Sequence, residues 1–337
     1  MLHGRTRVLS VARIILLTIG LGAGTECVAA TAPVPPAAKE GFVQVQGGPI
    51  WYRVFGPSAG TSASATPVLF IHGGPGGSSC KFEPVALLLS RFRPVVVYDQ
   101  LGSGRSGRPL DQKLWTVDRF ASEIVTLRKA LDLKEIHLLG HSWGAALAAQ
   151  YLLAGRPAGI KSVVLSGPLL STEKWIADAN ILRTQLPEKT QEILTHNEQA
   201  GTTDSQEYIA ATAEFYDKFL FHQELHPVVA SCAQAPFNME IYQLMWGPTE
   251  FHATGSLRGF DLTSRLHEIS APLLFMAGRY DEARPETVQT FARLVPGSRV
   301  EILENSGHMA PVEEPERYAA ILESFFETSE HTMRKHH

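Results

Sequence analysis

The stretch IHLLGHSWG, residues 136–144, decides the fold class that the sequence predicts. Its apolar half, 136–139, is typical of a buried strand, and the small residues after Gly144 are typical of a helix. A serine on a tight turn between strand and helix has a strained backbone, and Gly140 and Gly144 leave room for that turn. The hydroxyl then lies beside a helix N-terminus, which favours negative charge. We therefore predict that Ser142 is a nucleophile, the alternative being an ordinary turn.

Short apolar runs on both sides of this stretch are rich in β-branched residues and predict further strands. Helical patterns lie between them, notably at 117–131 and 144–153, and a final amphipathic helix is expected at 315–326. Strands that alternate with helices indicate an α/β fold with a mostly parallel sheet flanked by helices. The expected strands are 42–45, 50–55, 68–71, 95–98, 136–139, 163–165, 272–276 and 299–303.

The alternation of strands and helices stops between residues 171 and 260. This segment has no strong strand pattern, and it contains twelve acidic and five basic side chains. It is expected to form several helices joined by polar loops. The simplest organisation is a core made of residues 41–170 and 261–330, interrupted by a helical cap at 171–260.

The N-terminus has the order of a secretory signal peptide. Arginines at 5, 7 and 13 precede an apolar run at 14–24, and small residues follow up to residue 32. We expect a signal peptide at 1–30, a linker at 31–40 and an exported protein, periplasmic or secreted; a disordered or anchoring tail is the alternative. The apolar run is about half of what a bilayer span needs, so no permanent membrane anchor is expected.

Cleavage of the signal would leave two cysteines, Cys80 and Cys232. They could pair in an oxidising compartment, or remain two partly buried thiols. No His/Cys cluster with ligand spacing surrounds them, so no metal site is expected. The net charge of −4 and the absence of a basic patch speak against nucleic-acid binding. Nothing in the sequence indicates an oligomeric state.

A serine hydroxyl needs a base and an acid that orients it. Asp281 follows the expected strand 272–276, and His308 follows the strand 299–303. Both side chains are therefore expected at the carboxyl edge of the sheet, beside Ser142, in the chain order Ser, acid, His. Glu282 and Glu304 are rival acids, but Asp281 has the expected position in its loop.

The sequence HGGPG at 72–76 follows the expected strand 68–71. Glycines here let backbone N–H groups point inward, as an oxyanion hole requires. A flexible Gly-Pro turn is the alternative. The segment lacks the spacing of a phosphate-binding loop, which speaks against nucleotide binding.

Taken together, HGGPG at 72–76, DQLGSGRS at 99–106 and GHSWG at 140–144 resemble the proline iminopeptidases (prolyl aminopeptidases), serine peptidases with the α/β-hydrolase fold. Residues 242–251, YQLMWGPTEF, are similar to that family's tyrosine-to-GPSEF stretch, with Thr249 in place of Ser. The loops at 278–282 and 306–309 match its acid and base loops. The resemblance extends from about residue 41 to 327. Ala145 stands where the family commonly has a second glycine.

This resemblance implies a role for each matching residue. Ser142, Asp281 and His308 would form the catalytic triad, and the N–H groups of Gly74 and Trp143 the oxyanion hole. Glu250 and Glu282, with Tyr242 in the same stretch as Glu250, would bind the α-ammonium group of the substrate. Carboxylates suit that task because they form charge-assisted hydrogen bonds. For either glutamate, the alternative is a solvated surface residue.

The expected function is that of a serine exopeptidase without a cofactor. It would release an N-terminal residue, with proline as the expected one, from short peptides or amides through an acyl-enzyme. An esterase, lactonase or amidase with the same triad, including an amino-acid amidase, is the enzymatic alternative. A non-catalytic binding protein with this fold is the alternative of another class. The serine at position 142 speaks against epoxide hydrolases and dehalogenases, whose nucleophile is an aspartate.

Overall fold

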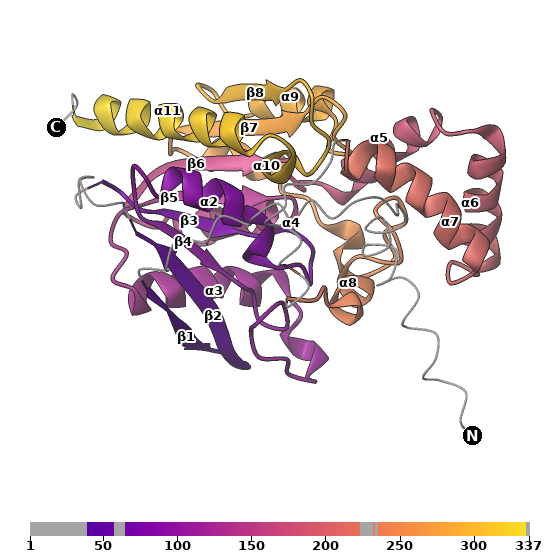
Figure 1. The fold of residues 1–337 in the computed structure, drawn as a ribbon, viewed down its shortest axis with the longest axis horizontal. Helices are drawn as coiled ribbons and strands as arrows, with labels where there is room; N and C mark the ends of the chain where they lie inside the picture. The colour runs from indigo at the N-terminus through magenta and orange to yellow at the C-terminus, as the bar shows by residue number, and fades with distance from the viewer. Residues whose placement is uncertain (1–38, 57–64, 223–231, 233–234, 335–337) are drawn as a thin grey trace, which may run out of the picture.

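The structure is a computed structural model that describes residues 39–56, 65–222, 232 and 235–334 (Figure 1). The expected signal peptide at 1–30 and most of the expected linker at 31–40 lie outside the described residues. None of the helices in the described part of the chain is both long and apolar enough to cross a membrane.

One eight-stranded sheet forms the centre of the molecule, in the order β1-β2-β4-β3-β5-β6-β7-β8. The pairs β1·β2 and β2·β4 are antiparallel, and all other neighbouring strands are parallel. Each strand expected from the sequence is present, so the predicted α/β fold is confirmed. The strands are β1 (Lys39–Val45), β2 (Gly48–Phe55), β3 (Val68–Ile71), β4 (Val95–Tyr98), β5 (Ile136–His141), β6 (Ile160–Ser166), β7 (Leu273–Gly278) and β8 (Arg299–Leu303).

Helices cover both faces of the sheet, which explains why its central strands are apolar throughout. On β3, Val68 and Phe70 belong to the same hydrophobic cluster as α2 (Glu83–Leu89) and α11 (Pro315–Arg334). Leu69 and Ile71 point the other way, toward a cluster formed with α3 (Val117–Ala130), α4 (Trp143–Gly155) and α9 (Pro285–Arg293). Figure 1 shows the two helical layers with the sheet between them.

The last helix, α11, is longer than the sequence pattern indicated, since it continues to Arg334 instead of ending near residue 326. A buried polar contact holds its last turns. The carboxylate of Glu330 accepts hydrogen bonds from Arg93 Nη1 and from His137 Nε2, both at 2.9 Å. Arg93 lies before β4 and His137 is in β5, so this contact is not visible in the helical pattern itself.

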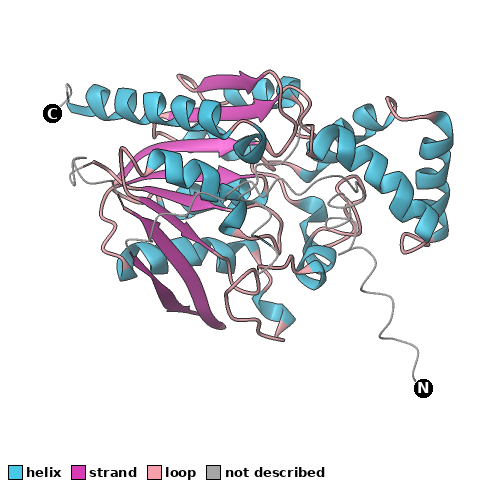
Figure 2. Ribbon diagram, viewed as in Figure 1, coloured by secondary structure: helices cyan, strands magenta, loops and turns pink. Residues whose placement is uncertain are grey.

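The chain between β6 and β7 forms the cap, whose described residues are helices and loops, as Figure 2 shows. An isolated bridge between Ser171 and Asp261 joins its two ends. In Figure 1 the helices α5, α6 and α7 lie to one side of the sheet, beyond the carboxyl ends of the parallel strands. The helices of the cap are α5 (Thr172–Arg183), α6 (Glu188–Ala200), α7 (Gln206–Phe215), the π-helical turn η3 (Tyr216–Leu220), α8 (Met239–Met245) and η5 (Ser256–Gly259). The remaining short helices, in the core, are η1 (Ser79–Phe82), η2 (Gln112–Leu114), η6 (Thr263–Glu268) and α10 (Ala310–Glu313).

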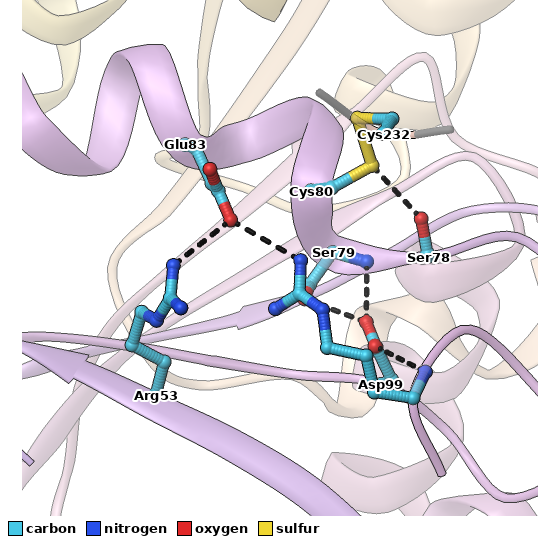
Figure 3. The surroundings of a disulfide bond; sticks show 8 residues. Arg53, Ser78, Ser79, Cys80, Glu83, Asp99 and Cys232 are labelled. Atoms are coloured by element: carbon cyan, nitrogen blue, oxygen red, sulfur yellow. Dashed lines mark hydrogen bonds and ion pairs between the residues drawn. A yellow bond between two sulfur atoms is a disulfide. The ribbon is translucent and has the colours of Figure 1, made fainter. Parts of the chain in front are cut away.

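A disulfide bond joins Cys80 to Cys232, with a Cα–Cα distance of 5.6 Å (Figure 3). The sequence left open whether these cysteines pair or remain thiols, and in the structure they form a disulfide bond. Cys80 is in η1 of the core, and Cys232 is in the cap between η3 and α8. The bond therefore links the cap covalently to the loop that follows β3.

Candidate active site

Ser142 occupies the turn between β5 and α4 with the strained backbone expected there, at φ 58° and ψ −122°. Gly144 is required because a Cβ at this position would lie 2.1 Å from the carbonyl oxygen of Ile71 in β3. The helix can therefore approach the sheet closely, and Ser142 is presented at the carboxyl edge of the strands. Only 9% of the surface of Ser142 is exposed, and it faces a cavity.

Asp281 and His308 come from the loops after β7 and β8, and the structure brings them together. His308 Nδ1 donates a hydrogen bond of 2.7 Å to Asp281 Oδ1. The same oxygen accepts the N–H of Ala283 at 2.8 Å, which fixes the carboxylate in its loop. Because Nδ1 carries the proton, Nε2 of His308 has a free lone pair and can accept a proton.

The loop that carries His308 is held by the cap and by the nucleophile turn. The N–H groups of His308 and Met309 donate to the carbonyls of Phe219 and Leu220 in η3, at 3.0 and 3.1 Å. His141 donates from Nε2 to the carbonyl oxygen of His308 at 2.9 Å. Burial lowers the pKa of His141 well below its ordinary value, so the ring is neutral at neutral pH. These contacts fix the base in place.

Gly167, directly after β6, is a site residue that the sequence analysis missed. Its φ is +48°, and a Cβ there would lie 2.8 Å from His308 Cε1 and 3.1 Å from Asp281 Oδ2. The Asp281–His308 pair therefore packs against a residue without a side chain. A glycine after an apolar strand is an ordinary sequence feature, and only the tertiary contact gives it this meaning.

The two residues expected to form the oxyanion hole, Gly74 and Trp143, belong to the loop after β3 and to the first turn of α4. Gly74 lines the cavity with a φ of +126°, and Trp143 is the first residue of α4, so its N–H has no intrahelical acceptor. Gln100 connects their two loops and was not predicted. It donates from Nε2 to the His72 carbonyl at 2.8 Å and accepts from Trp143 Nε1 at 3.0 Å.

Ser142, His308, Gly74, Tyr242 and Glu250 all line one cavity of about 110 Å³ between the core and the cap. Tyr242 donates a hydrogen bond of 2.6 Å from its hydroxyl to Glu250 Oε1. Burial raises the pKa of Glu250, and this hydrogen bond opposes the shift. The cap thus places a carboxylate within a small cavity that also contains the nucleophile and the base.

Glu282 is not among the described residues that line this cavity. It is 1% exposed, and its Oε1 is 3.7 Å from His308 Nε2. Burial and the charges of Glu250 and Asp281 raise the pKa of Glu282 well above its usual range. The other rival acid, Glu304, forms an ion pair of 2.6 Å with Arg279 at the surface. Of the three candidate acids, Asp281 is the one bonded to His308 Nδ1.

Tyr216 of η3 is a further cavity residue that the sequence did not indicate. Burial and the nearby charges of Glu250 and Glu282 raise its pKa well above the ordinary value. Its ring therefore stands close to both glutamates. In the part of the chain that the structure describes, no group of three or more His, Cys, Asp or Glu side chains could hold a metal ion.

An eight-stranded, mostly parallel sheet with a buried serine on its strand-to-helix turn defines a hydrolase of the α/β type. The model of the α/β-hydrolase fold family matches residues 66–315. The proline iminopeptidase of Heyndrickxia coagulans is 44% identical over 85% of this chain and 98% of its own length. That of Clostridium botulinum is 35% identical over 84% of this chain and 96% of its own length.

Among solved structures, the proline iminopeptidase of Mycobacterium smegmatis is similar, with a TM-score of 0.79 and 32% identity. The match covers 88% of this chain and all of the other. The chain belongs to the α/β-hydrolase fold family and, within it, to the proline iminopeptidases. The resemblance seen in the sequence motifs is thereby confirmed.

Proposed function

We propose that this protein is a serine exopeptidase that releases an N-terminal residue, preferentially proline, from short peptides or amides. One observation carries the proposal: the carboxylate of Glu250 lies on the wall of the same cavity as Ser142 and His308. A carboxylate desolvated there can bind a free α-ammonium group. The names of the relatives, proline iminopeptidases, support the choice of proline.

In the first half of the reaction, Ser142 Oγ attacks the carbonyl carbon of the N-terminal residue. His308 Nε2 takes the hydroxyl proton, and Asp281 stabilises the imidazolium that forms. The negative charge on the carbonyl oxygen is stabilised by the N–H groups of Gly74 and Trp143. The C–N bond then breaks, and His308 returns the proton to the leaving amine.

In the second half, water attacks the acyl-enzyme, again with His308 as the base, and frees the amino acid and Ser142. Glu250 and the cap restrict this chemistry to substrates whose amine end fits the cavity between cap and core. Glu282, which the resemblance also assigns to the ammonium group, lies in the field of Glu250 and would assist it there.

The proposal is tested with a panel of aminoacyl-arylamides, each with and without N-acetylation. We expect prolyl-arylamide to be hydrolysed best and its N-acetylated form to be inert, because acetylation removes the ammonium group. Equal hydrolysis of both forms, or of an ester without an amine, would favour an esterase or amidase instead. Absence of labelling by a fluorophosphonate would point to a non-catalytic binding protein.

We also propose that the protein is exported. The order of basic, apolar and small residues at the N-terminus supports this, and so does a disulfide bond, which persists in oxidising compartments. N-terminal sequencing of protein from its native host should find a mature start between about residues 29 and 35. A chain that begins at Met1 in the cytoplasm would contradict the proposal.

A further inference from the structure

A single ammonium group, that of Lys81, lies among the described residues that line the active-site cavity. Lys81 is in η1, on the core side of the cavity, whereas Glu250 belongs to the cap. The same cavity thus contains one cationic and one anionic side chain, together with Ser142. The triad mechanism gives Lys81 no role, since it needs neither a cation nor a proton at this position.

Lys81 and Glu250 interact without being bonded to each other. No ion pair involving Lys81 is found within the described parts of the chain, yet each of the two groups lies in the field of the other. Burial lowers the pKa of Lys81, and the charge of Glu250 opposes that shift. A partly desolvated cation that pairs with no carboxylate of the described residues is available to an anionic group of a ligand.

The backbone that carries Lys81 is firmly held on both sides. Ser79 donates from its N–H and its hydroxyl to Asp99 Oδ1, at 2.8 and 2.7 Å. Cys80 is bonded to Cys232, as Figure 3 shows. Glu83 forms ion pairs with Arg53 and Arg105 of the core. The base of the Lys81 side chain is therefore preorganised, as a binding residue requires.

We propose that Lys81 binds the free C-terminal carboxylate of a dipeptide whose α-ammonium group is held by Glu250, which makes dipeptides the preferred substrates. The inference rests on the proposed function and names its substrate class. The two charges of an extended dipeptide lie roughly 7 Å apart, at 3.3–3.6 Å per residue. Lys81 and Glu250 carry charges of opposite sign on the wall of one cavity, so they complement the two charged ends of such a zwitterion.

The test compares two substrates that differ in one charge, Pro-Gly and Pro-Gly-amide. In the wild type, kcat/KM should be about 10- to 100-fold higher for Pro-Gly, the usual effect of one charged hydrogen bond. In Lys81→Met this ratio should fall close to one, because the free dipeptide loses its advantage. Lys81→Arg should keep most of the preference. Lys113→Met, at an exposed lysine, is the matched control and should leave the ratio unchanged.

A wild-type ratio near one would overturn the inference by itself, whether or not Lys81→Met folds. An equal loss on both substrates in Lys81→Met would also overturn it, since Lys81 would then act only on Glu250 or on the fold. Prolyl-arylamide, measured in parallel, separates the two proposals. If the wild type cleaves the arylamide but shows no dipeptide preference, the inference falls and the exopeptidase function stands. If it cleaves only amine-free esters, both fall.

Discussion

The core and the cap contribute different kinds of side chain to the same cavity. The core places Ser142, Asp281 and His308 on loops at the carboxyl ends of β5, β7 and β8, where the sheet determines their positions. The cap contributes Tyr242 and Glu250, whose positions depend on how its helices pack against the core. The triad and the carboxylate proposed to bind the substrate amine therefore sit on separate structural units and can be altered separately.

One aromatic side chain of the cap nevertheless also contacts the catalytic base of the core. Trp175 of α5 donates from Nε1 to the carbonyl oxygen of Glu250 at 3.1 Å. Its ring also lies edge-on to the imidazole of His308, with 5.5 Å between the ring centroids. A change in the packing of the cap can therefore move the imidazole of His308. Experiments on cap residues for this reason need two substrates, one with a free amine and one without, so that effects on the cap and on the triad can be separated.

The largest effect is expected in the core, from Ser142→Ala. Hydrolysis of prolyl substrates and of amine-free esters should fall together, by a factor on the order of 10⁴–10⁶ in kcat. The fold should be unchanged because the turn accommodates a smaller side chain. The measurement is kcat on both substrate types, with the thermal midpoint as the test of folding. Near-normal turnover would show that Ser142 is not the nucleophile.

A selective effect is expected in the cap, from Glu250→Gln. The variant keeps size and hydrogen bonding but removes the charge that would pair with the ammonium group. Loss of one partner of a desolvated pair costs ~2–5 kcal/mol, or roughly 30- to several-thousand-fold in kcat/KM. An amine-free ester should be hydrolysed about as before, so the ratio of the two kcat/KM values reports on the cap alone.

Glu240→Gln, at an exposed position on the same helix as Tyr242, is the control for this experiment and should leave the ratio unchanged. Glu282→Gln is expected to lower both rates, because its carboxylate lies 3.7 Å from His308 Nε2 as well as near Glu250. If neither Glu250→Gln nor Glu282→Gln changes the ratio, neither glutamate recognises the amine.

An intermediate effect is expected from Gly167→Ala, which alters the core but leaves every reacting side chain unsubstituted. The new methyl would displace His308, and a misplacement of about 1 Å can cost about 100-fold in rate. Both substrate types should be affected equally. Gly201→Ala is the matched control, since Gly201 also has a positive φ but nothing lies within 4 Å of its Cβ position. Equal activity in the two variants would mean that the base tolerates displacement.

The smallest effect is expected from pH. Burial raises the pKa of Glu250 and Glu282, which interact and titrate as a pair. Lys81, His308 and the Tyr242 hydrogen bond oppose the rise at Glu250, and Asp281 adds to it at Glu282. A protonated carboxyl does not pair with an ammonium group, so the ratio of prolyl to ester kcat/KM should increase with pH through the raised pKa. A ratio that stays flat as the pH rises above the ordinary pKa of a glutamate would exclude this, and Glu250→Gln should reduce the dependence.

Much of the core followed from local patterns in the sequence. Apolar runs such as 68–71 and 95–98 matched their strands residue for residue. Asp281 and His308 could be selected because each follows a strand, and the carboxyl ends of parallel strands meet at one edge. The order of strands, loops and helices along the chain therefore predicts which residues lie at the carboxyl edge of the sheet. The same logic does not reach the cap, where Glu250 was assigned by resemblance to a family.

The sequence by itself determined the fold class, the strands and the chemistry expected at Ser142, because these depend on periodicity and on spacing along the chain. Tertiary structure alone decided that Cys80 pairs with Cys232, that Gly167 makes room for His308, and that Lys81 shares a cavity with Glu250. These features depend on contacts between segments far apart in the chain. Such contacts are set by packing in three dimensions and leave no periodic signal in the sequence.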